Sequence, residues 1–210
     1  DKEVLAKRTP GFTPADIENI MNEAAILTAR KKEKEIHMDT IEEAITKVMV
    51  GVAKKSRVIS DKDRKLTAYH EAGHAICMHV LPNVNPVHQV TIIPRGRAGG
   101  FTEPLPQEDQ MYGTKKEMLE TIIMALGGRV AEELIMDDIS TGASNDLERV
   151  TNIARAMVTK YGMSEKMGPM VYGDSDDEVF LGNSITTKKN YSEEIAYEID
   201  KEVREIVENA

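Results

Sequence analysis

The residues with the clearest chemistry are two histidines four positions apart, His70 and His74, in the sequence His-Glu-Ala-Gly-His. On an α-helix, residues four apart lie on one face, about 5.4 Å apart along the axis, so both imidazoles can bind one Zn²⁺. Glu71 flanks that face, where it can take a proton from a metal-bound water and pass it to the leaving amine of a peptide bond. The pattern predicts a zinc peptidase. The alternative is a surface helix that carries two histidines beside an acid.

A hydrolytic zinc site needs a third protein ligand, and the sequence leaves several candidates open. Val80 occupies the position at which an extended motif on the same helix would need a further histidine. Cys77 lies one turn beyond His74, but a lone cysteine on an apolar helix face is more often a small buried hydrophobe. His79 and His88 are expected in surface or structural positions. The better candidates are the acids Glu132, Glu133 and Asp146. An acid in the first turn of a helix also complements the helix dipole, which is the alternative interpretation of Asp146.

Helices are expected to position these residues. Hydrophobic residues make up 40% of the 210 residues, but aromatic residues only 4%, with no Trp and 12 Met. Such a composition favours a core of aliphatic and thioether side chains on helices and argues against an all-β fold. Capping signals and apolar spacing predict helices that begin near Thr13, Asp39, Ser60, Thr114 and Asn145, and a last helix through Ile195 and Ile206.

The remaining segments have other signatures. Residues 87–93 are strand-like and residues 101–102 can resume an extended path, which predicts a small sheet or hairpin. The glycine pair at 127–128 inside a helical pattern predicts the close approach of another backbone. Residues 51–57 are expected to form a linker, and residues 174–178 an acidic loop.

Charge and composition exclude several classes of function. Against 27 Lys and Arg stand 36 Asp and Glu, and a net charge of −9 opposes binding to nucleic acid. One cysteine cannot form an internal disulfide, and no apolar run approaches the ~18 to 20 residues that cross a bilayer. We therefore expect a soluble chain. It begins at Asp1 without a methionine, which suggests a piece of a longer protein.

Five segments together resemble the FtsH-type membrane-anchored, ATP-dependent zinc metalloproteases, a branch of the AAA+ proteases. The segments occur in the order of that family and extend the resemblance over almost the whole chain. They are residues 11–30 (GFTPADIENIMNEAAILTAR), 54–75 (KKSRVISDKDRKLTAYHEAGHA), 90–96 (VTIIPRG), 127–133 (GGRVAEE) and 140–151 (STGASNDLERVT).

The resemblance assigns roles within the site. It implies that His70 and His74 bind one Zn²⁺ per chain, that Glu71 is the catalytic acid and base, and that Asp146 is the third metal ligand. It further implies that Glu132 does not bind the metal but orients a histidine that does.

The resemblance also implies a domain organisation: residues 1–50 as the helical lid of an AAA+ ATPase module, 51–57 as a linker and 58–210 as a mostly helical peptidase domain with a small sheet. No phosphate-binding Gly-x-x-x-x-Gly-Lys-Ser/Thr loop is present, so ATP and Mg²⁺ belong to the full-length parent alone. The parent is expected to be a homo-hexamer that missing upstream segments anchor in the bacterial inner membrane, with this region in the cytoplasm.

Substrate binding is expected at Gly99, Gly100, Phe101 and Thr102, where an unfolded polypeptide can pair as an added strand. A glycine-rich hairpin without a ligand is the alternative there. We interpret the chain as the endopeptidase part of a protease that degrades unfolded or membrane-extracted proteins. The alternative is a non-catalytic helical ring-assembly module with a structural or vestigial metal site.

Overall fold

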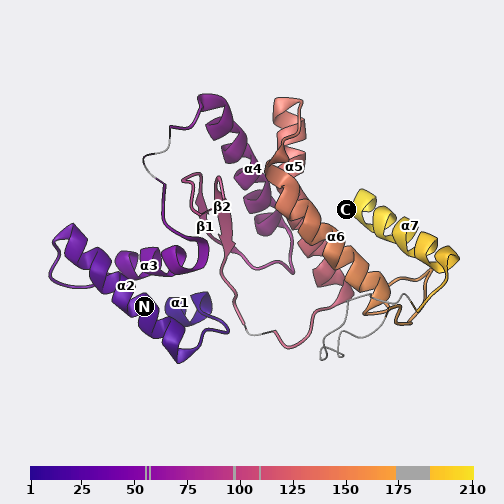
Figure 1. The fold of residues 1–210 in the computed structure, drawn as a ribbon, viewed down its shortest axis with the longest axis horizontal. Helices are drawn as coiled ribbons and strands as arrows, with labels where there is room; N and C mark the ends of the chain where they lie inside the picture. Colours follow the sequence, from indigo (N-terminus) through magenta and orange to yellow (C-terminus); the bar gives the residue numbers. More distant parts are fainter. Residues whose placement is uncertain (55, 57, 97, 109, 174–189) are drawn as a thin grey trace, which may run out of the picture.

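The computed structural model describes residues 1–54, 56, 58–96, 98–108, 110–173 and 190–210, and the expected acidic loop at 174–178 lies outside the described residues. Within them the fold is mainly helical with one small sheet, as the composition predicts (Figure 1). The elements are α1 (Lys2–Arg8), α2 (Pro14–Lys31), α3 (Met38–Val50), α4 (Asp61–Val80), β1 (Val87–Thr91), β2 (Phe101–Pro104), α5 (Lys115–Met136), the 3-10 turn η1 (Thr141–Ala143), α6 (Ser144–Thr159) and α7 (Glu193–Asn209).

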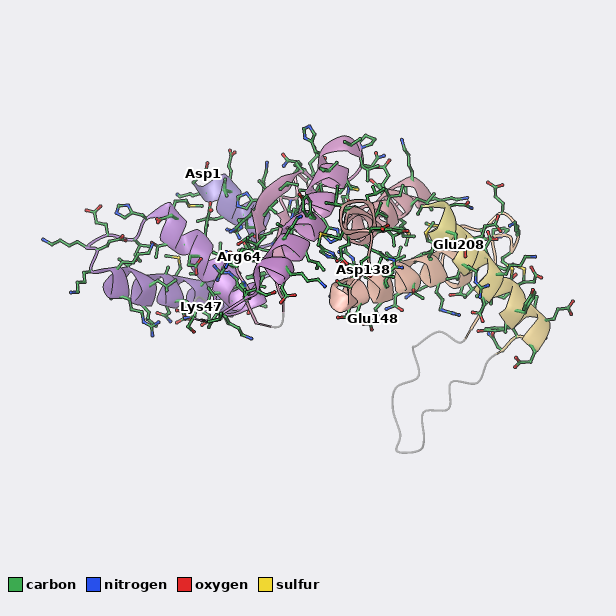
Figure 2. All side chains as sticks on the ribbon, turned by 90° about the horizontal axis from the view of Figure 1, so that it is seen from above. Asp1, Lys47, Arg64, Asp138, Glu148 and Glu208 are labelled. Carbon is green, nitrogen blue, oxygen red and sulfur yellow. The ribbon has the colours of Figure 1, made fainter. Side chains whose placement is uncertain are left out.

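The helices form two groups, each with its own buried core. In Figure 1, α1 to α3 lie together at one end, whereas α4 to α7 and the sheet make up the rest. Figure 2 shows the same elongated arrangement from above, with Asp1 and Lys47 toward one end and Glu208 at the other. The smaller core consists of Ile20, Ala24, Ala44 and Ile45. The larger core lies between α5, α6 and α7 and consists of Ile122, Ala125, Val150, Ala154, Met157, Val158, Met167, Ile199 and Val203.

In the first group, α2 begins with the expected cap: the Thr13 side chain accepts from the Asp16 backbone N–H, and the Asp16 carboxylate accepts from Thr13. Helix α3 begins at Met38, one residue before the predicted start, and its N-cap His37 makes no side-chain hydrogen bond. The sequence did not predict α1. That short helix ends in Arg8, a buried side chain that binds Glu103 of β2, so a distant part of the chain helps to hold it in place.

The sheet is an antiparallel pair, β1 with β2, in which Val90 lies opposite Thr102 and Thr91 opposite Phe101. This confirms the predicted small sheet. Both strands contact α4, which begins after the N-cap Ser60 and ends at Val80. The sheet thus lies beside the helix that carries the two histidines.

Helices α4 and α5 form the most extensive contact between elements, and glycines make it possible. A Cβ at Gly73 would lie 2.2 Å from the Gly127 carbonyl oxygen, and a Cβ at Gly127 would lie 2.9 Å from the Gly73 carbonyl oxygen. The two backbones therefore approach more closely than any side chain would allow, which confirms the predicted close approach at Gly127. Helix α6 packs against α5, and α7 packs against α6. No helix in the described part of the chain is both long and apolar enough to cross a membrane.

Candidate metal centre

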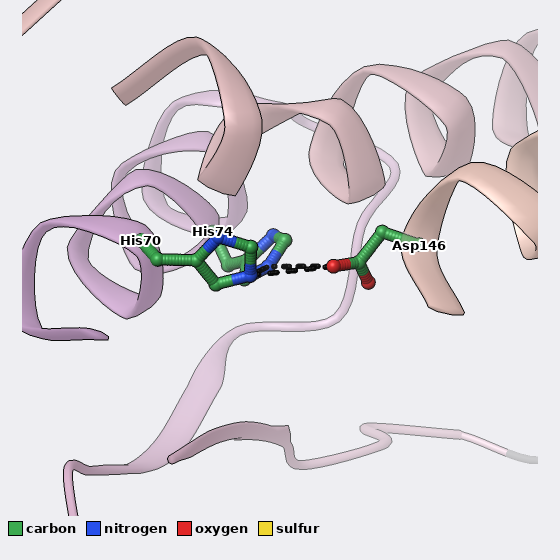
Figure 3. Close-up of side chains that lie close together, drawn as sticks. All are labelled: His70, His74 and Asp146. Carbon is green, nitrogen blue, oxygen red and sulfur yellow. Dashed lines mark hydrogen bonds and ion pairs between the residues drawn. The ribbon is translucent and has the colours of Figure 1, made fainter. Parts of the chain in front are cut away.

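Three side chains from two helices converge on one point. His70 and His74 extend from α4 and Asp146 from the first turn of α6, as Figure 3 shows. His70 Nε2 lies 3.1 Å from His74 Nε2. The Oδ2 atom of Asp146 lies 3.3 Å from His70 Nε2 and 3.6 Å from His74 Nε2. Ligand atoms about 2.0 to 2.1 Å from a tetrahedral zinc ion are roughly 3.3 Å apart, so the three separations fit zinc.

The other ring nitrogens fix which atoms face the centre. His70 Nδ1 lies 2.7 Å from Glu132 Oε1, and His74 Nδ1 lies 2.9 Å from the Met124 carbonyl oxygen. Both partners are acceptors, so each Nδ1 carries the proton, and in the neutral rings both Nε2 atoms present lone pairs to each other. Two lone pairs 3.1 Å apart repel, and a cation bound between them and Asp146 removes that repulsion.

Gly128 of α5 provides the space beside these nitrogens. A Cβ at this position would lie 2.6 Å from His74 Nε2 and 2.7 Å from His70 Nε2. The prediction for the glycine pair was therefore right for Gly127, whereas Gly128 faces the imidazoles rather than a backbone. The absence of a side chain leaves both Nε2 atoms accessible to a metal ion.

Glu132 connects the two parts of the centre. Its side chain is fully buried, Oε1 accepts from His70 Nδ1, and Oε2 accepts from the Ser140 backbone N–H at 2.7 Å. Ser140 is the residue before η1, which leads directly into the helix of Asp146. One carboxylate thus binds both His70 and the turn that leads to Asp146.

The charges of the site shift the pKa values of its members. Burial alone would lower the pKa of His70, but its hydrogen bonds with Asp146 and Glu132 outweigh burial and raise it above 6.5. Burial alone would raise the pKa of Asp146, but hydrogen bonds with His70 and His74 outweigh burial and hold it well below its usual range. Asp146 is therefore a carboxylate at neutral pH, as a metal ligand must be.

Glu71 lies next to the three converging groups and is itself buried. Its Oε2 accepts a hydrogen bond from the Thr102 hydroxyl at 2.8 Å. Burial raises the pKa of Glu71, and the hydrogen bond from Thr102 opposes part of that rise. A carboxylate with a raised pKa accepts and returns a proton more readily near neutral pH.

A cavity of about 850 Å³ opens onto these groups and is lined by the segment expected to bind substrate. Gly99, Gly100, Phe101 and Thr102 all contribute to its wall, as do Met49 and Val50 at the end of α3. Among the described residues, β2 has a single strand neighbour, β1, in a sheet of two strands. The strand that lines the cavity therefore retains one edge without a strand partner in the part of the chain that the structure describes.

The structure separates the other candidate ligands from the centre. The sulfur of Cys77 packs against Gly127, where a Cβ would lie 2.7 Å from it. The side chains of Glu133 and His79 are exposed. His88 lies 3.8 Å from Glu42 in the first group of helices. In the described residues, His70, His74 and Asp146 are the one group of three whose atoms could hold a metal.

Sequence reasoning missed three contributions to the site. Gly128 makes room for the imidazoles, the Met124 carbonyl fixes the tautomer of His74, and the Thr102 hydroxyl binds Glu71. A main-chain carbonyl leaves no signal in the sequence. For Thr102 the sequence predicts a contact with substrate, and the residues around it carry no signal that its hydroxyl binds Glu71 of α4.

Comparison with known proteins agrees with this geometry. Residues 57–210 match the family described as peptidase family M41, and residues 1–43 match the AAA+ lid domain. The chain belongs to peptidase family M41. The His-Glu-Ala-Gly-His helix, Asp146 and the cavity all lie within the part that matches family M41.

Curated relatives in family M41 are similar over almost the whole chain. The chain is 70% identical over 208 residues to ATP-dependent zinc metalloprotease FtsH 2 of Alkaliphilus metalliredigens (strain QYMF), an alignment that covers 99% of this chain and 30% of the relative. It is 61% identical to ATP-dependent zinc metalloprotease FtsH 1 of Thermoanaerobacter sp. (strain X514), with 99% of this chain and 34% of the relative covered. For ATP-dependent zinc metalloprotease FtsH of Veillonella parvula the identity is 58%, over 100% of this chain and 33% of the relative. The chain thus spans about a third of the length of these relatives.

Proposed function

We propose that this chain is the zinc-dependent endopeptidase part of an ATP-dependent, membrane-anchored protease that degrades unfolded or membrane-extracted proteins. In this proposal His70, His74 and Asp146 bind one Zn²⁺, Glu71 is the catalytic acid and base, and Glu132 orients His70. The observation that carries the proposal is the convergence of His70 Nε2, His74 Nε2 and an Asp146 oxygen within 3.1 to 3.6 Å, with Glu71 beside them.

The side chains then divide the work of peptide hydrolysis. Zinc, when bound, supplies a Lewis acid that polarises a peptide carbonyl and lowers the pKa of a water. The Glu71 carboxylate takes a proton from the attacking water and donates it to the leaving amine nitrogen. Glu132 keeps the proton of His70 on Nδ1, which leaves Nε2 free for the metal.

The cavity supports a polypeptide substrate. Residues 99–102 line it. The edge of β2 that has no strand partner among the described residues offers backbone N–H and C=O groups to an extended chain. Because such pairing uses hydrogen bonds to the backbone and not to side chains, it suits unfolded proteins of varied sequence. We assign Gly99, Gly100, Phe101 and Thr102 to substrate binding on this basis.

The division into a lid at residues 1–50, a linker at 51–57 and a peptidase domain at 58–210 is supported by the two separate cores. We propose that ATP and Mg²⁺ act in the full-length protein, which is anchored in the bacterial inner membrane with this region in the cytoplasm. Assembly as a homo-hexamer is supported by apolar side chains that a single chain leaves exposed on α4 and α5, namely Ile76, Val80, Val130 and Leu134.

The proposal is tested by zinc analysis and casein degradation with the full-length protein. We expect Glu71→Gln to retain one zinc per chain and to lose casein degradation by about 10²-fold or more, because the acid and base is gone while the ligands remain. Asp146→Asn is expected to lose both zinc and activity. Cys77→Ala serves as the control and is expected to keep both.

Each other outcome identifies what is wrong. A Glu71→Gln protein that degrades casein at the wild-type rate would exclude the catalytic role of Glu71. Loss of zinc from Cys77→Ala but not from Asp146→Asn would move the third ligand to Cys77. If the wild-type hexamer contained no zinc, or if its zinc had four protein ligands, the ring-assembly module would be favoured instead.

A further inference from the structure

The carboxylate of Glu71 is held from outside the helix that carries it. Thr102 Oγ1 donates to Glu71 Oε2 at 2.8 Å and also lies 3.2 Å from the Glu71 carbonyl oxygen. The other carboxylate oxygen, Oε1, faces Gly100, where a Cβ would lie 3.0 Å from it. Both oxygens of Glu71 therefore border the same short segment at the start of β2.

The register of the sheet sets up this contact. Thr102 pairs with Val90, and successive residues of a strand point to opposite faces. Thr102 and Gly100 accordingly share the face toward α4, where both meet Glu71. Glu103 points the other way and binds Arg8 of the first helix group. A shift of one residue in the pairing would turn the Thr102 hydroxyl away from Glu71.

The contact leaves one carboxylate oxygen free. The Thr102 hydroxyl occupies Oε2, and no donor in the described residues reaches Oε1 within hydrogen-bond distance. A glutamate has three side-chain torsions, and proton transfer requires its oxygen within about 2.6 to 3.2 Å of the proton's donor atom. Fixing Oε2 restricts the torsions and holds Oε1 in one direction.

We propose that Thr102 is a positioning residue for Glu71: its hydroxyl fixes the carboxylate through Oε2 so that Oε1 exchanges the proton during peptide hydrolysis. The inference rests on the proposed function and adds to it, because it gives the Thr102 side chain a role separate from substrate pairing. Pairing uses the backbone of β2, which a change in the Thr102 side chain leaves intact.

The test compares Thr102→Val with Thr102→Ser in the full-length protein, using a fluorogenic peptide to obtain kcat and KM. Valine keeps the β-branched shape but removes the hydroxyl, so we expect kcat to fall about 10- to 100-fold with KM and zinc content unchanged. Serine restores the hydroxyl and is expected to recover most of the rate. Thr91→Val is the matched control: its hydroxyl accepts from the Ile93 backbone N–H, away from Glu71, and kcat is expected to stay at the wild-type value.

A second measurement separates positioning from a structural role. In a Glu71→Gln background, where proton transfer has been removed, Thr102→Val is expected to cause no further loss of the residual rate. A wild-type kcat in Thr102→Val, a change confined to KM, loss of zinc, or a serine variant as slow as the valine one would each overturn the proposal. Failure of the proposed function itself would appear differently, as full activity in Glu71→Gln alone.

Discussion

At the scale of single residues, Glu132 contacts two separate parts of the site without being one of the three proposed metal ligands. Its carboxylate accepts from His70 Nδ1 with one oxygen and from the Ser140 N–H with the other. Partners of this kind outside the ligand set typically change metal affinity by about 10- to 100-fold. Glu132 also contributes to the raised pKa of His70 in the metal-free protein.

This gives a prediction for the pH dependence of zinc binding. Nε2 of His70 must lose its proton to bind the metal, and hydrogen bonds with Asp146 and Glu132 outweigh burial and raise the pKa of His70. As the solution is acidified, the apparent zinc affinity is therefore expected to begin falling at a higher pH than it would with an unperturbed histidine. The slope should be about tenfold per pH unit for each proton displaced. Removing the negative charge in Glu132→Gln lowers the pKa of His70 and moves the onset to lower pH.

Chelator competition between about pH 8.5 and 5.5 measures both effects. At the alkaline end, Glu132→Gln is expected to bind zinc about 10- to 100-fold more weakly than wild type. The difference in zinc affinity between the two proteins should become smaller toward acid pH. Glu133→Gln, which alters the exposed neighbouring acid, is the control. A variant curve parallel to wild type at every pH would contradict the assigned link between Glu132 and His70.

At the scale of elements, the contact between α4 and α5 depends on glycines with different neighbours. Gly73 meets the Gly127 carbonyl, a backbone atom that cannot move aside, whereas Gly128 meets the imidazoles of the two histidines. We expect Gly73→Ala to separate the helices and lower the free energy of unfolding by about 1 to 3 kcal/mol or more. Gly128→Ala is expected to weaken zinc binding at least about tenfold, with a smaller loss of stability in the metal-free protein.

Urea unfolding of the metal-free proteins and zinc titration of the same samples separate the two effects. Gly113→Ala is a suitable reference, because a Cβ there would meet nothing within 4 Å. If Gly128→Ala bound zinc normally, the space beside the imidazoles would not be required for the metal.

Local sequence signals predicted most of the helices and strands. The features that the sequence did not predict depend on contacts between residues far apart in the chain. The caps at Thr13 and Thr114 depend on residues three positions away, so the sequence reveals where these helices begin. The sequence did not predict helix α1, because its Arg8 binds Glu103, which lies 95 residues away in the chain.

In the site, helical spacing alone brings His70 and His74 together. Asp146 was one of several candidates until the resemblance singled it out, and the contact between Thr102 and Glu71 depends on strand register.

At the scale of the whole molecule, two buried arginines cross between the lid and the peptidase region in opposite directions. Arg8 of α1 binds both carboxylate oxygens of Glu103 at 2.8 Å. Arg95 of the segment between the strands donates to Glu43 of α3 at 2.6 Å. Both arginines are almost fully buried, so each depends on the partner that the other region supplies.

We therefore expect Glu103→Ala to lower the free energy of unfolding by up to about 3 to 5 kcal/mol, because it leaves the buried Arg8 without its main partner. Thermal and urea unfolding measure the loss. Asp39→Ala, which removes an exposed ion pair with Lys31 in the same helix group, should shift the midpoint far less. Combining Arg8→Met with Glu103→Leu should recover much of the stability, and a double variant as unstable as Glu103→Ala would contradict the assignment.

The reciprocal arrangement of these charges also restricts how such proteins can be recombined. A chimera that received its lid from another protein would need an arginine to meet Glu103 and an acid to meet Arg95, each from a different helix of the donor. A donor that supplied one of the two would leave a charge of the recipient unpaired in a buried junction. Lid and peptidase region are therefore best exchanged as one unit, with the crossover placed before α1 rather than in the segment that joins them.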